Sequence, residues 1–219
     1  LSNMRGKKIL VIGGTGFLGF HLIKRCISLK MTVTSISRRK PNQFQRLDNV
    51  EYKTCNITSL QNLKKQIDND YDYIVNLGGN IDHKNKNKTY RSHYLGVKNL
   101  YNIFKNKKIK RFVQIGSSSE YGKIFGPVKE NNTCKPKMIY GRSKLMATNF
   151  LFKKNKLKKF PFTILRFFQV YGPFQKTNRL IPFVISSSLQ NKRFDCSEGS
   201  QLRDFLYIDD AIDSIIKSF

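Results

Sequence analysis

The chain has 219 residues, enough for one main domain with a small appendage, and its hydrophobic share of 39% is ordinary for a globular protein. Its 41 Lys and Arg against 14 Asp and Glu give a net charge of +27; because no basic motif is interleaved with aromatic residues, we expect a small polyanionic ligand and not nucleic acid. Four scattered cysteines without a Cys-x-x-Cys pair, and no apolar run of about 20 residues, argue against a structural metal and a membrane span, so we expect a cytoplasmic protein.

Strands and helices alternate along the first part of the chain. Short apolar or β-branched runs predict strands over residues 7–12, 32–37, 50–53 and 73–77. Apolar residues at helical spacing predict helices over residues 17–29 and 59–68. The pattern is therefore strand, helix, strand, repeated.

The alternation continues through the second part. Helical spacing over residues 90–104 is followed by a strand at 111–115, a helix at 139–155 and an apolar run at 162–168. This order predicts an α/β fold, a Rossmann-like doubly wound parallel sheet with ligands outside the carboxyl ends of its strands. We expect a Rossmann domain over residues 1–173 and, where the periodicity weakens, part of a small substrate-binding lobe over 174–219.

A glycine-rich turn, Gly13-Gly14-Thr15-Gly16-Phe17-Leu18-Gly19, follows the first strand directly. Glycines at these spacings permit a tight turn, let the backbone approach a pyrophosphate, and let the helix pack closely on the strand. The helix N-terminus then offers N–H groups to the anion. The turn therefore predicts an NAD(P) site formed by Gly13, Thr15, Gly16, Phe17, Leu18 and Gly19.

The second strand ends in Ser37-Arg38-Arg39-Lys40, without the acidic residue that usually bonds the adenosine ribose of NAD. Arg38 or Arg39 could instead pair with the 2′-phosphate of NADP. The alternative is that these are ordinary basic residues of a surface loop. We favour NADP slightly over NAD, and expect cofactor contacts from Ser37, Arg38 and Arg39 and from Leu77 and Gly78 at the end of the fourth strand.

Tyr140 and Lys144 lie four residues apart on a predicted helix, so both project from one face. An ammonium close to a phenol stabilises the phenolate, which would make Tyr140 a usable acid or base. Ser117 and Ser118 end the fifth strand, where a hydroxyl could bond the same substrate oxygen. Either feature alone also fits an incidental helix pair or a serine-rich turn.

Taken together with the segments Leu165–Pro173 and Arg203–Asp210, these motifs resemble the extended short-chain dehydrogenase/reductases, which include nucleotide-sugar epimerases, dehydratases and ketoreductases. The resemblance implies that Tyr140 is the acid or base and that Lys144 both tunes it and holds the nicotinamide ribose. Counting back from Tyr121-Gly122 places the catalytic hydroxyl at Ser117, whereas the serine block alone would place it at Ser118.

The resemblance also implies a nucleotide-diphosphate sugar as substrate and a homodimer. Arg203 would lie near the diphosphate, and the further substrate-binding positions would be Glu120 and Gln169. Asn56 and Ile57 occupy the cofactor position where the family usually has Asp beside the adenine, and His93 stands where a helix Asn is common. Relatives generally continue well past the position of Asp210, so we expect the substrate lobe to be incomplete.

Three chemistries share this scaffold, so the fold alone does not decide among them. A dehydratase normally has an acidic residue directly after the catalytic hydroxyl, and serines fill that place here. The basic Arg38-Arg39 pair favours a reductase. The predicted function is therefore hydride transfer by a 4-ketoreductase of a 4-keto-6-deoxy nucleotide sugar; the alternatives are an NAD-dependent 4-epimerase similar to UDP-glucose 4-epimerase, a 4,6-dehydratase, and a non-catalytic dinucleotide sensor.

Overall fold

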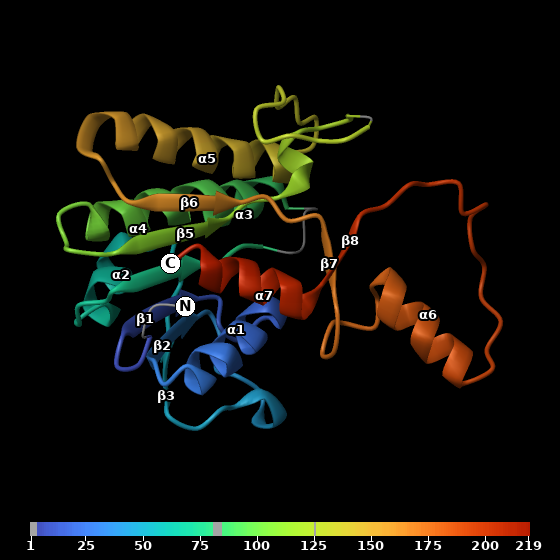
Figure 1. The fold of residues 1–219 in the computed structure, drawn as a ribbon, viewed down its shortest axis with the longest axis horizontal. Helices are drawn as coiled ribbons and strands as arrows, with labels where there is room; N and C mark the ends of the chain where they lie inside the picture. Colours follow the sequence, from blue (N-terminus) through green and yellow to red (C-terminus); the bar gives the residue numbers. More distant parts are fainter. Residues whose placement is uncertain (1–3, 81–84, 125) are drawn as a thin grey trace.

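A computed structural model describes residues 4–80, 85–124 and 126–219, and its centre is a six-stranded sheet (Figure 1). All five strand pairs are parallel, in the order β3-β2-β1-β4-β5-β6. The strands are β1 (Lys8–Ile12), β2 (Thr32–Ser37), β3 (Val50–Thr54), β4 (Tyr73–Asn76), β5 (Arg111–Ile115) and β6 (Phe162–Leu165). The central strands are near-continuous apolar runs because helices cover both of their faces.

Helices cover the two faces of the sheet in two groups. One face carries the packed side chains of α2 (Leu60–Gln66), α4 (Gly96–Phe104) and α5 (Ile139–Lys158). The other face carries α1 (Phe17–Ser28) and α7 (Ile208–Lys217). Alternate residues of β1 enter the two cores, Leu10 one and Val11 the other. The predicted doubly wound α/β fold is confirmed.

The helix expected over residues 90–104 consists of three pieces. It begins as α3 (Lys86–Tyr90), passes through one π-helical turn, η2 (Arg91–Leu95), and continues as α4. The extra residue of a π turn displaces the side chains that follow it, and such turns often occur at functional sites. Here the π turn carries the buried His93.

The last part of the chain divides between two locations. Strands β7 (Gln169–Tyr171) and β8 (Phe205–Tyr207) form a separate parallel pair, and α6 (Leu180–Leu189) projects away from the sheet (Figure 1). Helix α7, by contrast, buries Ile208, Ile212 and two further isoleucines in the same core as α1. The expectation that residues 174–219 all belong to a substrate lobe is therefore corrected for α7, which is part of the Rossmann core.

Candidate active site

The glycine turn between β1 and α1 adopts the geometry that its glycines predict. Gly13 has a left-handed φ of +83°, and its N–H donates to the Ile36 carbonyl at 2.8 Å, which ties the turn to β2. The Gly16 N–H donates to the Gly13 carbonyl at 3.0 Å. A Cβ on Gly19 would lie 2.4 Å from that same carbonyl oxygen, so only glycine lets α1 approach the turn this closely.

The N-terminus of α1 faces this turn without a side-chain cap. Gly16 is the N-cap residue and supplies no side-chain hydrogen bond, and the N–H groups of Phe17 and Leu18 belong to the first helical turn, which has no intrahelical acceptors. The neighbouring Thr15 N–H donates to the Ser37 hydroxyl oxygen at 3.2 Å. Such N–H groups bind phosphate oxygens, so the turn fits the pyrophosphate of a dinucleotide.

A cavity of about 560 Å³, the size of a small-molecule site, lies beside the carboxyl ends of β2 and β3. The described residues that line it include no carboxylate; they are Arg38, Thr54, Cys55, Asn56, Asn62, Lys65 and Gln66. Two of the predicted cofactor residues, Arg38 and Asn56, therefore line the cavity, whereas Arg39 does not. Ile57 is buried and packs against Gly78. Lys65, on α2, carries a charge that the sequence did not single out.

The turn after β4 lies against the glycine turn. The Leu77 N–H donates to the last carbonyl of β1 at 3.0 Å, and a Cβ on Gly13 would lie 3.2 Å from the backbone nitrogen of Gly78. The buried Asn76, which the sequence analysis missed, accepts the Gly78 N–H at 3.0 Å and donates to Gln114 at 2.7 Å. Asn76 therefore fixes the turn that faces the predicted pyrophosphate site.

Tyr140 and Lys144 project from the first turns of α5. Lys144 is buried, and its Nζ donates to the Ile115 carbonyl at the end of β5 at 2.7 Å. The same Nζ lies 6.0 Å from the centre of the Tyr140 ring, which is partly exposed. The structure therefore brings the predicted acid or base together with its cation, and anchors the cation to the sheet.

One histidine lies between the phenol and the segment that borders the glycine turn. The rings of His93 and Tyr140 meet edge to face with their centroids 5.1 Å apart. His93 Nε2 also lies 3.1 Å from the Asn80 carbonyl oxygen, and a Cβ on Gly79 would collide with the imidazole. Because the adjacent Gly78 touches the glycine turn, the phenol and that turn flank one region at the carboxyl edge of the sheet.

The two candidate serines lie in the serine loop (Ser117–Glu120), which follows β5. Ser117 is buried, and its Oγ accepts the Ser119 N–H at 3.2 Å; Ser118 is partly exposed. A Cβ on Gly141, the residue after the phenol, would lie 2.3 Å from the Ser119 carbonyl oxygen. The loop therefore touches α5 beside the phenol, and both serines remain candidates.

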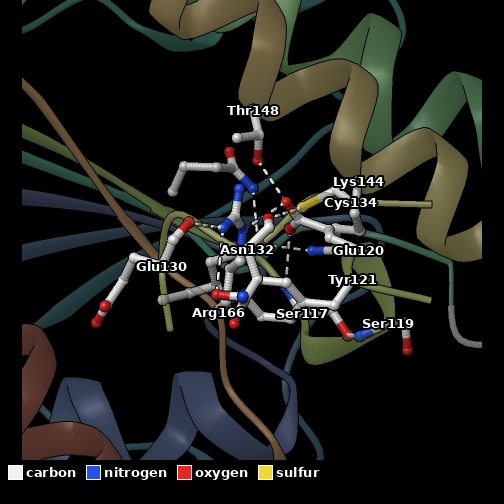
Figure 2. A network of polar contacts seen from close by, with 12 residues as sticks. Ser117, Ser119, Glu120, Tyr121, Glu130, Asn132, Cys134, Lys144, Thr148 and Arg166 are labelled. Atoms are coloured by element: carbon white, nitrogen blue, oxygen red, sulfur yellow. Dashed lines mark hydrogen bonds and ion pairs between the residues drawn. The ribbon is translucent and has the colours of Figure 1, made fainter. Parts of the chain in front are cut away.

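Glu120 lies inside the protein and away from any substrate surface. Its side chain is 0% exposed, and its oxygens accept hydrogen bonds from the Ser117 N–H, the Thr148 hydroxyl and the Arg166 guanidinium (Figure 2). The structure thus corrects the expectation that Glu120 contacts the sugar. Arg166, the cation that compensates the buried carboxylate, lies 46 residues further along the chain, beyond the reach of a local pattern.

Gln169 and Arg203 belong to adjoining segments outside the main sheet. Gln169 begins β7, and its N–H donates to the Asp204 carbonyl at 3.1 Å. Arg203 precedes β8 and donates to the side chain of Gln201. Both side chains are exposed. Their contacts with a sugar and a diphosphate stay predictions.

Neither a metal cluster nor a membrane helix occurs in the part of the chain that the structure describes. Within it, no three His, Cys, Asp or Glu side chains gather so as to hold a metal ion. No helix there combines the length and the apolar character that crossing a bilayer requires.

Residues 9–218 match the model of the NAD dependent epimerase/dehydratase family. An uncharacterized UDP-glucose epimerase of Bacillus subtilis is 28% identical over 224 residues, which cover 95% of this chain and 71% of that protein. The match to the family model thus includes the glycine turn, the serine loop and both strands of the separate pair, β7 and β8.

Two solved structures share the fold at similar identity. UDP-glucuronic acid 4-epimerase from Bacillus cereus, in complex with UDP-glucuronic acid and NAD, gives a TM-score of 0.85 at 27% identity, over 95% of this chain and 72% of that one. UDP-N-acetylglucosamine 4-epimerase from Methanobrevibacter ruminantium M1 gives 0.89 at 25% identity, over 98% of this chain and 73% of that one. In both comparisons, more than a quarter of the other chain has no counterpart here.

Proposed function

Because this chain belongs to the NAD-dependent epimerase/dehydratase family, a family of enzymes, we propose that it transfers hydride at a carbon of a nucleotide-linked sugar. The observation that carries the proposal is the placement of Tyr140 and Lys144 at the carboxyl edge of the sheet, where His93 lies between the phenol and the segment 78–80 that borders the turn that fits a dinucleotide. A phenol beside an ammonium is suited to general acid–base catalysis. This argues against a non-catalytic dinucleotide sensor.

In this proposal, Tyr140 moves the proton of the reacting sugar oxygen, and Lys144 stabilises the phenolate form. An ammonium has three donors; one is used on the Ile115 carbonyl, which leaves two for the phenol and for a ribose hydroxyl of the cofactor. Ser117 accepts the Ser119 N–H and keeps its own proton to donate to the sugar oxygen, with Ser118 as the alternative. When bound, the dinucleotide supplies or takes up the hydride.

The adenosine end of the cofactor is proposed to occupy the cavity beside β2 and β3. Arg38 and Lys65 give its lining two positive charges, and Asn56 stands where an acid is usual. A 2′-phosphate would gain charge-assisted hydrogen bonds there, whereas a carboxylate would repel it. We therefore favour NADP over NAD, which suits a reductase that exchanges a reduced cofactor.

A 4-ketoreductase is accordingly our first proposal, and a 4-epimerase is the second. The epimerase is favoured by the related structures that contain NAD. A 4,6-dehydratase is supported less, because Glu120, the acid nearest to Ser117 in sequence, is fully buried and bonded to Arg166. The homodimer implied by the resemblance stays a prediction.

Replacing Tyr140 by Phe tests the catalytic proposal. We expect turnover of a nucleotide sugar to fall at least about a hundredfold, because the proton donor is lost, while affinity for the dinucleotide changes little. Tyr101→Phe removes the same hydroxyl from a buried site on α4 and is the matched control. Full activity of the Tyr140→Phe variant would refute the assignment.

The cofactor proposal is tested by binding measurements and by mass spectrometry of the nucleotide that copurifies with the protein. Arg38→Ser should weaken NADP by about tenfold, the loss of one charge-assisted pair, and leave NAD nearly unaffected. A larger loss in Arg39→Ser would instead assign the phosphate to Arg39. Exchangeable NADP supports the reductase, and tightly held NAD supports the epimerase.

A further inference from the structure

The buried carboxylate of Glu120 connects three elements around the candidate site (Figure 2). Its Oε1 accepts the Ser117 N–H at 2.9 Å, inside the serine loop. Its Oε2 accepts the Thr148 hydroxyl of α5 at 2.8 Å and the Arg166 Nε, just after β6, at 2.9 Å. One side chain thus links the serine loop, the helix that carries the phenol, and the edge strand of the sheet.

The surroundings of this carboxylate supply the compensation that a buried charge requires. Arg166 forms the ion pair and also donates to the Tyr121 hydroxyl at 3.2 Å and to the Glu130 carbonyl at 3.1 Å. Burial lowers the pKa of the Arg166 guanidinium, but its hydrogen bonds to Tyr121 and Glu120 outweigh this and raise that pKa, so the guanidinium stays charged. Gly116 leaves the necessary room, since a Cβ there would lie 2.6 Å from Glu120 Oε1.

Thr148 lies on the catalytic side of α5. It follows Lys144 by four residues, as Lys144 follows Tyr140, so the three side chains lie along one face of the helix. Lys144 attaches this face to the last residue of β5, and Thr148 attaches it to the serine loop. The two attachments together fix how far the phenol stands from the serines.

We propose that Glu120 is a positioning residue, which through Thr148 holds the serine loop at the distance from Tyr140 that proton transfer requires. This inference rests on the proposed function. It gives Glu120 no contact with substrate, in keeping with its burial. Instead, the carboxylate keeps the catalytic hydroxyl and the phenol at hydrogen-bonding distance from the same sugar oxygen. Small displacements of such groups reduce rates strongly.

The test removes the Thr148 hydroxyl and leaves the ion pair intact. Thr148→Val should lower kcat about tenfold, with KM for the nucleotide sugar changed less than about twofold. Thr148→Ser keeps a hydroxyl and should restore kcat to near the wild-type value. The matched control is Thr34→Val on β2, because Thr34 also donates from a buried site to a carboxylate, Glu51, at 3.0 Å.

Both valine variants lose one threonine–carboxylate bond, so similar falls in Tm are expected, but only Thr148→Val should lose kcat. Wild-type kcat in Thr148→Val, or an equal loss in Thr34→Val, would overturn the inference. Hydrogen–deuterium exchange of the serine-loop peptide provides a readout independent of turnover, and it should rise in Thr148→Val alone. If the wild-type protein turns over no nucleotide sugar, the proposed function fails, and unchanged exchange in Thr148→Val would then overturn the positioning role as well.

Discussion

The close approach of α1 to the glycine turn makes Gly19→Ala a sensitive test of the cofactor site. The new Cβ would lie 2.4 Å from the Gly13 oxygen and 2.5 Å from the Gly14 Cα, against an ordinary contact of 3.4 Å or more. Both obstacles are backbone atoms, so α1 has to retreat by about 1 Å. Such overpacking costs about 1–3 kcal/mol, and the better helix propensity of Ala returns at most about 1 kcal/mol.

Because both obstacles are backbone atoms, we take the upper part of the overpacking range, about 2–3 kcal/mol; the net loss of about 1–2 kcal/mol lowers the Tm of a chain of this size by roughly 2–8 °C. Thermal unfolding followed by circular dichroism, with and without dinucleotide, measures the effect. Gly16→Ala is the contrasting variant, because its Cβ meets only the Gly13 oxygen, at 3.3 Å; it should keep the wild-type Tm and lose only dinucleotide affinity. An unchanged Tm in Gly19→Ala would refute the reasoning.

Three further outcomes follow from the packing and charges. Ile215→Ala, in the buried stripe of α7, should lower the free energy of unfolding in urea by about 2–5 kcal/mol; a loss below about 1 kcal/mol would contradict the place of α7 in the Rossmann core. Burial raises the pKa of the Cys26 thiol to about 12 and also raises that of Cys55, so iodoacetamide at pH 8 should label the exposed Cys196 first, as peptide mass spectrometry would report; equal labelling of Cys26 would contradict this. Burial lowers the pKa of Lys53, but hydrogen bonds to Asp68 and Glu51 outweigh it and raise that pKa, while Lys53 lowers the pKa of Asp68. Asp68→Asn should therefore reduce Tm at pH values between 3.8 and 10.5, the ordinary pKa values of Asp and Lys. The difference in Tm should fade as the pH falls through the lowered pKa of Asp68, and also as the pH rises through the raised pKa of Lys53.

The main sheet could be predicted from the sequence because its information is local. Each strand is a short apolar or β-branched run, and each helix between strands carries an apolar stripe, so periodicity indicates both. The π turn at residues 91–95 was missed, since a single extra residue leaves the helical spacing almost unchanged. Helix α7 was placed in the wrong unit because its partner, α1, lies almost 200 residues earlier in the sequence.

For the candidate site, the sequence could group only residues that lie close together along the chain. The glycine turn and the Tyr140–Lys144 pair are spacings within one turn or one helix, so the sequence alone brings their members together. The burial of Glu120 depends on Arg166 and Thr148, which come from other elements. A single glutamate beside a serine run indicates neither partner, and its role follows only from the tertiary structure.

The pairing of β7 with β8 has a consequence for how enzymes of this architecture diversify. The chain leaves this two-stranded pair after Tyr171 and rejoins it at Phe205, which pairs with Gln169 at the start of β7. The segment between Tyr171 and Phe205 is a long loop whose two ends are fixed by strand pairing. It holds several of the exposed apolar side chains, among them Phe183 and Leu189. Doubling the length of such a loop adds only about 0.6 kcal/mol of closure entropy, so we expect insertions and deletions there to change this exposed apolar surface while the Rossmann sheet stays as it is.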